Sequence, residues 1–374
     1  MLNSLKANLF SHIANLPGWR TNRKIVVIES DDWGSIRMPS REVYDILLKR
    51  GYPVDVCHYN RNDSLESNSD LEQLFEVLTA FKDKNGNHPV ITANNIVANP
   101  DFQKIKEADF QKYFYEPFTE TLKRYPKHDK VYDLIKEGIS KGIFYPQFHG
   151  REHVNTFSWI DALSKNEKTT REIFDYGMFT VHLKNNLNCR REFLDSLGTH
   201  TEKEMLKIKE SVVEGLQLFE NLWGYQSKSF IATCYIWHPK VEEYLNDFEI
   251  KHIQSGRVQK IPLLNREGYK IKRLYTGRKN KLGQIYTCRN VIFEPSENPN
   301  KDWINTAMNE IEIVFRWQKP AIICSHRVNY IGFINEENKN RNLKLLKELL
   351  TKIIKKWPDT EFMNSSELGA LIRN

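Results

Sequence analysis

The sequence has no long apolar run. Its longest uninterrupted apolar stretches, such as Ile25–Ile28 and Ala321–Cys324, are far shorter than the roughly 20 residues that cross a bilayer. No apolar segment of the secretory type accompanies the basic residues among positions 1–24, so we expect neither a membrane span nor a secretory signal. A mean hydropathy of −0.59 and an apolar fraction of 40% are typical of a soluble globular protein.

Paired cysteines and glycine-rich phosphate loops are also missing. The five cysteines are scattered, odd in number and never spaced as Cys-x-x-Cys: Cys57, Cys189, Cys234, Cys288 and Cys324. This pattern excludes a disulfide framework and a cysteine-type zinc site, and it favours reduced thiols in a cytoplasmic protein. Neither Gly-x-Gly-x-x-Gly nor a Walker loop is present, so dinucleotide-binding and P-loop classes lose their main support.

Charge is modest overall but uneven. The 55 basic and 48 acidic residues leave a net charge of +7. Residues 257–281 alone carry nine Lys or Arg against the single acid Glu267. This segment is either a solvated basic hairpin or a patch for an anionic substrate such as an acidic glycan. We do not expect nucleic-acid binding, because no recognition motif accompanies the charge.

Short apolar, β-branched runs alternate with longer amphipathic stretches. The runs cover residues 24–30, 89–97, 142–149, 229–237, 250–255, 286–293, 321–325 and 361–364. Helical periodicity covers residues 102–125, 131–141, a stretch opened by the capping box Thr201-x-x-Glu204, and 336–357 before Pro358. Alternating strands and helices predict an α/β fold with a parallel sheet. About seven or eight strands favour a closed or nearly closed barrel, with a doubly wound open sheet as the alternative.

Polar residues follow three of these runs. Asp31 and Asp32 come directly after the first buried run, His149 and His153 follow the third, and His326 ends a late one. Function in such barrels lies at the carboxyl ends of strands. One helical turn would bring His149 and His153 to one side, as a metal-ligand pair requires. Two histidines and one aspartate, with an open position for water, are typical of catalytic zinc.

These motifs resemble the polysaccharide deacetylase superfamily, the metal-dependent family-four carbohydrate esterases. Its Asp-Asp strand end, its His-(Ser/Thr)-x-x-His motif and its Leu-x-His motif occur here in the same order over residues 24–370. The resemblance implies that Asp31 is the base, that Asp32, His149 and His153 bind a divalent metal, with zinc favoured, and that His326 is the general acid.

The resemblance further implies a distorted (β/α)7-8 barrel of the polysaccharide deacetylase type in a bacterial protein. We expect one domain over residues 1–374, with helical insertions near 99–141 and 182–224. The implied reaction is removal of an acetyl group from an N- or O-acetylated sugar in a polysaccharide or its precursor. A non-catalytic metal- or sugar-binding relative and a glycoside hydrolase on a related barrel remain open as alternatives.

Substrate contacts are expected from residues near the motifs, namely Trp33, Tyr235, Trp237, Arg151 and Arg327. Aromatic rings in such positions can stack on sugar faces. The family's Arg-x-Pro-x-Gly motif, whose arginine orients the base, is absent. Arg151 or Arg327 could take over that orienting role.

Overall fold

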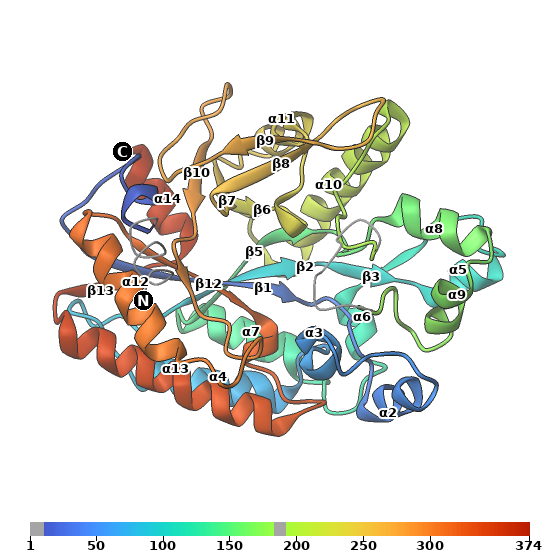
Figure 1. Ribbon diagram of the computed structural model, residues 1–374, viewed down its shortest axis with the longest axis horizontal. Helices are drawn as coiled ribbons and strands as arrows, with labels where there is room; N and C mark the ends of the chain where they lie inside the picture. The colour runs from blue at the N-terminus through green and yellow to red at the C-terminus, as the bar shows by residue number, and fades with distance from the viewer. Residues whose placement is uncertain (1–10, 183–191) are drawn as a thin grey trace, which may run out of the picture.

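The computed structural model describes residues 11–182 and 192–374. At its centre is a parallel sheet in the order β10-β7-β6-β5-β2-β1-β12-β11, with β13 beside β1 (Figure 1). The central strands are β1 (Lys24–Trp33), β2 (Ile91–Ile96), β5 (Phe144–Gly150), β6 (Ser229–Ile231), β7 (His252–Ser255), β10 (Ile285–Cys288), β11 (Val291–Ile292), β12 (Ala321–His326) and β13 (Thr360–Phe362). Each lies within or beside one of the predicted runs.

The sheet is curled so that its two edge strands are joined by a short connection. β10 pairs with β7 at one end of the strand order, and β11 pairs with β12 at the other. Arg289 and Asn290 are the whole connection between β10 and β11, so this one stretch joins the two edges of the sheet. The expected fold class, an α/β protein with a distorted (β/α) barrel, is confirmed.

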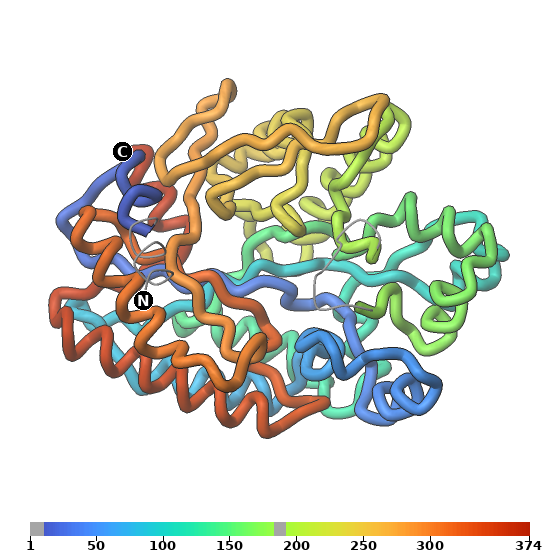
Figure 2. Tube along the Cα trace, viewed as in Figure 1, coloured from blue at the N-terminus to red at the C-terminus, as the bar shows by residue number. Residues whose placement is uncertain are grey.

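Helices surround the sheet. They are α2 (Arg41–Lys49), α3 (His58–Asn62), α4 (Asn68–Thr79), α5 (Phe102–Glu107), α6 (Phe118–Leu122), α7 (Val131–Ser140), α8 (Thr156–Ser164), α9 (Lys168–Phe174), α10 (Glu202–Trp223), α11 (Pro239–Asp247), α12 (Trp303–Arg316), α13 (Glu336–Lys356) and α14 (Ser365–Arg373). In Figure 2, the chain of α4, α7 and α13 runs along one side of the sheet, and α10 and α11 lie on the other. Thr201 caps α10 by accepting from the backbone N–H of Glu204, as the sequence predicts.

The predicted helix over residues 102–125 is wrong. Helix α5 ends at Glu107, and Asp109 and Phe110 both take positive φ angles. Strand β4 (Tyr115–Pro117) then pairs antiparallel with β3 (Ala98–Pro100). Pairing of these two short strands outweighs the local helical periodicity. Part of the other expected insertion, residues 183–191, lies outside the described residues.

Two further expectations concern membranes and thiols. No helix among the described residues is long and apolar enough to span a bilayer. The described cysteines, Cys57, Cys234, Cys288 and Cys324, are free, and Cys189 lies outside the described residues. The free thiols agree with the expectation that the scattered cysteines form no disulfide framework.

Strand register sets the position of the candidate site. In the pairing of β1 with β12, Asp31 stands opposite His326. β5, which carries His149, is separated from β1 by β2 alone. The apolar part of β1, Ile25–Ile28, is at most 1% exposed, so the strand is anchored in the core and delivers its two aspartates at a fixed place. The predicted strand ends therefore meet at one end of the barrel.

Candidate metal centre and active site

The end of β1 departs from regular strand geometry. Its pairing with β2 shifts register between Ser30 and Trp33, and Asp32 has a φ of 75°. A regular strand would point Asp31 and Asp32 to opposite faces, whereas here both line one pocket. Gly34 follows with a φ of 80°, and a Cβ there would lie 2.3 Å from the carbonyl oxygen of Ile96. The chain therefore needs glycine to turn away at this point.

His149 and His153 converge without the expected helical turn. His149 is the next-to-last residue of β5, Gly150 has a φ of 141°, and residues 151–155 form an irregular loop. The two rings nonetheless lie 5.4 Å apart between centroids. The prediction of a helical turn is wrong, because Gly150 redirects the chain in a conformation that other residues rarely adopt. The predicted closeness of the two imidazoles is nevertheless present.

Asp32, His149 and His153 have the geometry of a three-ligand metal site. Oδ1 of Asp32 lies 3.4 Å from Nε2 of His149 and 3.1 Å from Nε2 of His153. Zinc bonds of about 2.0–2.1 Å in a tetrahedron place ligand atoms about 3.3 Å apart. The three side chains are buried and grouped closely enough to hold one ion.

The two histidines also present nitrogen lone pairs that can bind a cation. Nδ1 of His149 lies 3.0 Å from the carbonyl oxygen of Ile231, so Nδ1 is the donor and, in the neutral ring, Nε2 carries a lone pair. That lone pair faces the Asp32 carboxylate, and two acceptors at this distance need a cation or a proton between them. Burial lowers the pKa of His153 to about 4 against the opposing effect of Asp32, which keeps this ring in the neutral form that binds metals.

Arg37 binds the other carboxylate oxygen of Asp32. Its guanidinium donates to Oδ2 of Asp32 at 3.2 Å and lies 3.4 Å from a carboxylate oxygen of Asp63. Burial would raise the pKa of Asp32, but His153, Arg37 and His149 hold it well below its ordinary range. Arg37, which the sequence reasoning missed, thus fixes the carboxylate with Oδ1 turned toward the histidines.

Asp31 is oriented by an arginine from the far side of the barrel. Arg289 donates to both carboxylate oxygens of Asp31, at 2.5 and 2.8 Å, and to Glu29 at 2.8 Å. Asn94 adds a hydrogen bond of 2.7 Å. Burial would raise the pKa of Asp31, but Arg289 outweighs burial, and the pKa falls to about 2. The expectation that Arg151 or Arg327 replaces the missing motif arginine is therefore corrected to Arg289.

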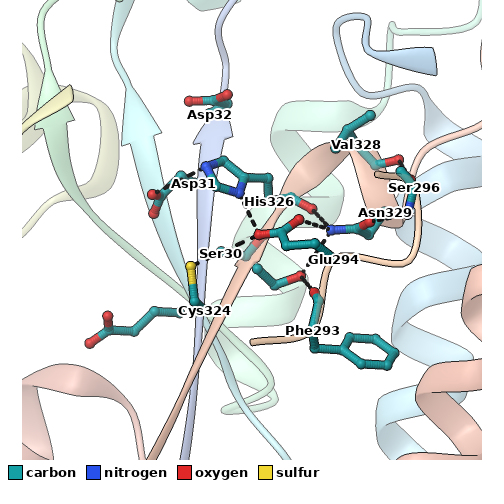
Figure 3. A network of polar contacts seen from close by, with 12 residues as sticks. Ser30, Asp31, Asp32, Phe293, Glu294, Ser296, Cys324, His326, Val328 and Asn329 are labelled. Atoms are coloured by element: carbon teal, nitrogen blue, oxygen red, sulfur yellow. Dashed lines mark hydrogen bonds and ion pairs between the residues drawn. The ribbon is translucent and has the colours of Figure 1, made fainter. Parts of the chain in front are cut away.

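His326 lies between two carboxylates (Figure 3). Its Nδ1 is 2.6 Å from Glu294, and its Nε2 is 3.7 Å from Asp31. Asn329 donates to the other oxygen of Glu294 at 2.7 Å. Burial alone would lower the pKa of His326, but Glu294 and the two aspartates of β1 outweigh it and raise the pKa to about 9. The ring is therefore an imidazolium at neutral pH, as a proton donor requires.

Glu294, Cys324 and His326 also lie close enough to hold a metal. Thiol chemistry argues against that use, because the thiolate is the metal-binding form. Burial raises the pKa of Cys324 to about 12, so the thiol stays protonated. We therefore interpret this group as a Glu294–His326 pair beside a neutral thiol.

The pocket that joins these groups has a volume of about 230 Å³. It is lined by Asp31, Asp32, His149, His153, His326 and Tyr235, among others. The hydroxyl oxygen of Tyr235 accepts from Arg289 at 3.3 Å. Tyr235 is thus a predicted substrate contact that the structure places at the pocket.

The other predicted substrate contacts lie elsewhere. Trp33 and Trp237 are 1% and 0% exposed, and their indole N–H groups donate to Ser30 and Glu242. Arg327 is buried against Asp63 and Glu66. Arg151 pairs with Glu152 and Glu214 and lines a different cavity. The assignments of Trp33, Trp237 and Arg327 are corrected, because core partners bury their rings and guanidinium group. The assignment of Arg151 is corrected because its cavity is not the one that Asp31 and His326 line.

The chain is similar to known proteins in fold and not in sequence. The sequence matches no family model and no curated protein. The fold is similar to a chain described as a glycoside hydrolase/deacetylase from Parabacteroides distasonis, with 11% identity, a TM-score of 0.48, and coverage of 96% of this chain and 73% of that one.

Two further structures show similarity at the same level. A chain described as a polysaccharide deacetylase from Pseudomonas aeruginosa PAO1 has 7% identity, a TM-score of 0.47, and coverage of 93% and 91%. A CE4 family pseudoenzyme from Bacillus anthracis has 10% identity, a TM-score of 0.37, and coverage of 93% and 66%. Similarity of this degree assigns no activity to the chain, which has to be inferred from the side chains of the site.

Proposed function

We propose that the protein is a metal-dependent hydrolase that removes an acetyl group from an N- or O-acetylated sugar in a polysaccharide or its precursor. The observation that carries the proposal is the arrangement around one pocket. Oδ1 of Asp32 lies 3.4 and 3.1 Å from the Nε2 atoms of His149 and His153, and an ionised Asp31 and a protonated His326 lie beside this group.

Each side chain has a separate task. Asp31, kept ionised by Arg289, accepts a proton from the attacking water. His326, kept protonated by Glu294, donates a proton to the leaving amine or alcohol. Tyr235 lines the wall of the pocket. A divalent ion at the Asp32–His149–His153 group would polarise the acyl carbonyl and acidify water, and two neutral imidazoles with one carboxylate suit zinc.

No observation favours a glycoside hydrolase. That chemistry needs two carboxyl groups flanking the bond, about 5–9.5 Å apart. The predicted candidates beside Asp31 do not line its pocket: Glu29 accepts from Arg289 and Ser365, and Glu152 accepts from Arg151. Glu29 and Glu152 therefore form part of the ion pairs that surround the site.

Acetate release tests the proposal. Wild-type protein loaded with zinc is incubated with a panel of N- and O-acetylated oligosaccharides, and acetate and new reducing ends are both quantified. We expect acetate without new reducing ends. Asp31→Asn keeps the shape of the side chain and should lower the rate about 10²–10⁴-fold with the bound metal retained.

The control is Asp161→Asn, which removes an exposed carboxylate of α8 paired with Lys165, and it should behave as wild type. Reducing ends in place of acetate would show a glycoside hydrolase. Full activity in Asp31→Asn would refute the role of that residue, and metal binding with no acetate from any substrate would favour a non-catalytic relative.

A further inference from the structure

The basic segment of the sequence forms an exposed hairpin beside the pocket. Strands β8 (Val258–Pro262) and β9 (Tyr269–Arg273) pair antiparallel outside the barrel sheet. In Figure 1 the hairpin lies on the opposite side of the central sheet from α13. It leaves the barrel directly after β7, whose carboxyl end lies at the active-site end.

The hairpin is bonded to the segment that carries Tyr235. The backbone N–H of Trp237 donates to the carbonyl of Lys260 at 3.3 Å, and the side chain of Gln259 donates to the carbonyl of Trp237 at 3.1 Å. At the base of the hairpin, Gly256 lies so close to the ring of Tyr235 that a Cβ there would be 3.3 Å from it. The segment that carries Tyr235 and the hairpin are therefore in direct contact.

One face of the hairpin is covered and the other is open. On the inner face Gln259 is buried, and Lys272 donates to the hydroxyl of Tyr286 at 2.7 Å. The outer face pairs Val258 with Arg273 and Lys260 with Ile271 across the strands. Ile271 is 56% exposed, and the two cations beside these aliphatic residues are exposed as well.

The exposed cations lack counter-charges. Lys260 and Arg273 on the outer face and Arg266 between the strands form no ion pair with any residue in the described ranges 11–182 and 192–374. The same holds for Lys270 on the other face of β9 and for Lys279 and Lys281 beyond the hairpin. Other exposed basic residues, such as Lys136 and Lys207, do pair with an acid one turn away. A ribbon of uncompensated positive charge attracts a polyanion collectively, over a range of about 8–10 Å at physiological salt.

We propose that this outer hairpin face binds an anionic glycan and that the substrate of the pocket is such a glycan, carrying carboxylate or phosphate groups along its length. The inference rests on the proposed deacetylase function and narrows its substrate class. The cations hold the charged part of the chain, and the aliphatic side chains between them contact its less polar ring faces. Tyr235 then receives the sugar that enters the pocket.

The test uses two defined oligosaccharides of equal length. Hyaluronan oligosaccharide and fully N-acetylated chito-oligosaccharide both contain N-acetylglucosamine, but only hyaluronan adds a carboxylate in every repeat. Affinities are measured by calorimetry in the zinc-loaded Asp31→Asn protein, to prevent turnover, at low and at physiological salt. We expect hyaluronan to bind about ten-fold more tightly at low salt and to lose this advantage as salt rises.

Charge reversal of the hairpin supplies the decisive comparison. Lys260→Glu/Arg273→Glu should weaken hyaluronan binding at least about five-fold and leave chito-oligosaccharide binding unchanged. The matched control, Lys344→Glu/Lys347→Glu, reverses two exposed charges on α13 and should change neither. Circular dichroism spectra confirm that both variants are folded.

Equal binding of the two sugars, or equal effects of the two double variants, would overturn the proposal. So would hairpin-dependent binding of phosphatidylglycerol vesicles or of single-stranded DNA without binding of hyaluronan. Metal content, together with acetate release by wild-type protein that retains Asp31, reports on the proposed function separately. If the protein releases acetate but does not prefer hyaluronan, the proposed function holds and the hairpin proposal fails. If it prefers hyaluronan but releases no acetate, hyaluronan binding by the hairpin holds and the proposed function fails.

Discussion

Replacing Arg289 with methionine should damage both stability and chemistry. Methionine roughly keeps the length of the side chain but removes the charge shared by two buried carboxylates, Asp31 at 5% and Glu29 at 0% exposure. Removing one partner of a buried ion pair costs about 3–5 kcal/mol, because the other charge is left uncompensated. For 374 residues the unfolding entropy is about 0.8 kcal/mol/K, so the melting temperature should fall by about 4–6 °C.

The chemical effect follows from the pKa of Asp31. In the wild type, Arg289 keeps this carboxyl charged down to about pH 2. Its unfolded value is about 3.9, so the lowered pKa stabilises the fold above that pH and the contribution is lost as pH falls toward 2. Without Arg289 burial dominates, Asp31 takes up a proton at higher pH, and acetate release should fall while the metal stays bound.

A double variant separates the two effects. Glu29→Gln in the Arg289→Met background removes one of the two stranded charges and should recover part of the lost melting temperature, because Glu29 no longer has to be buried unpaired. It should recover little activity, because Asp31 still lacks its partner. Scanning calorimetry, metal analysis and acetate release measure the three quantities. An Arg289→Met protein with unchanged melting temperature and activity would refute the reasoning.

Two further predictions concern other parts of the molecule. Glu294→Gln removes the carboxylate that raises the pKa of His326, so the alkaline limb of the rate profile, where the imidazolium loses its proton, should move about one to two units to lower pH; an unmoved limb would exclude His326 as the proton donor. Gly369→Ala places a Cβ 2.4 Å from the buried ring of His252 and should cost about 1–3 kcal/mol of stability, which thermal unfolding measures against Ala370→Ser on the same helix; equal stability of the two variants would contradict the packing.

The barrel could be predicted because its strands are buried on both faces. Ile25–Ile28 and Ala321–Ile323 are almost wholly buried, and such strands appear as continuous apolar runs. The candidate metal ligands could be predicted for the same reason, since Asp32 comes just after the first such run, His149 ends the third and His153 follows four residues later. Glu294 follows Phe293 in the same way, and applying the rule to that strand would have found it.

Other parts depend on tertiary contacts that a local pattern does not contain. Arg289 interrupts an apolar run, but its partner Asp31 lies 258 positions away, and their meeting depends on how the sheet closes. Trp33 and Trp237 follow strands, where the sequence predicts contact with substrate, yet Trp33 packs against Phe144 and the backbone of Trp237 is bonded to the hairpin beyond β7. The turn at Gly150 likewise follows from backbone conformation that the His-x-x-x-His spacing does not specify.

Metal content tests the central claim most directly. Wild type, His149→Ala and Asp31→Asn are purified without chelators, incubated with zinc, desalted and analysed by mass spectrometry for bound metal. We expect about one ion per chain in the wild type and in Asp31→Asn, and loss of the ion in His149→Ala with the fold retained. A wild type that binds no metal, or a His149→Ala protein that binds it as tightly, would refute a metal site at Asp32, His149 and His153.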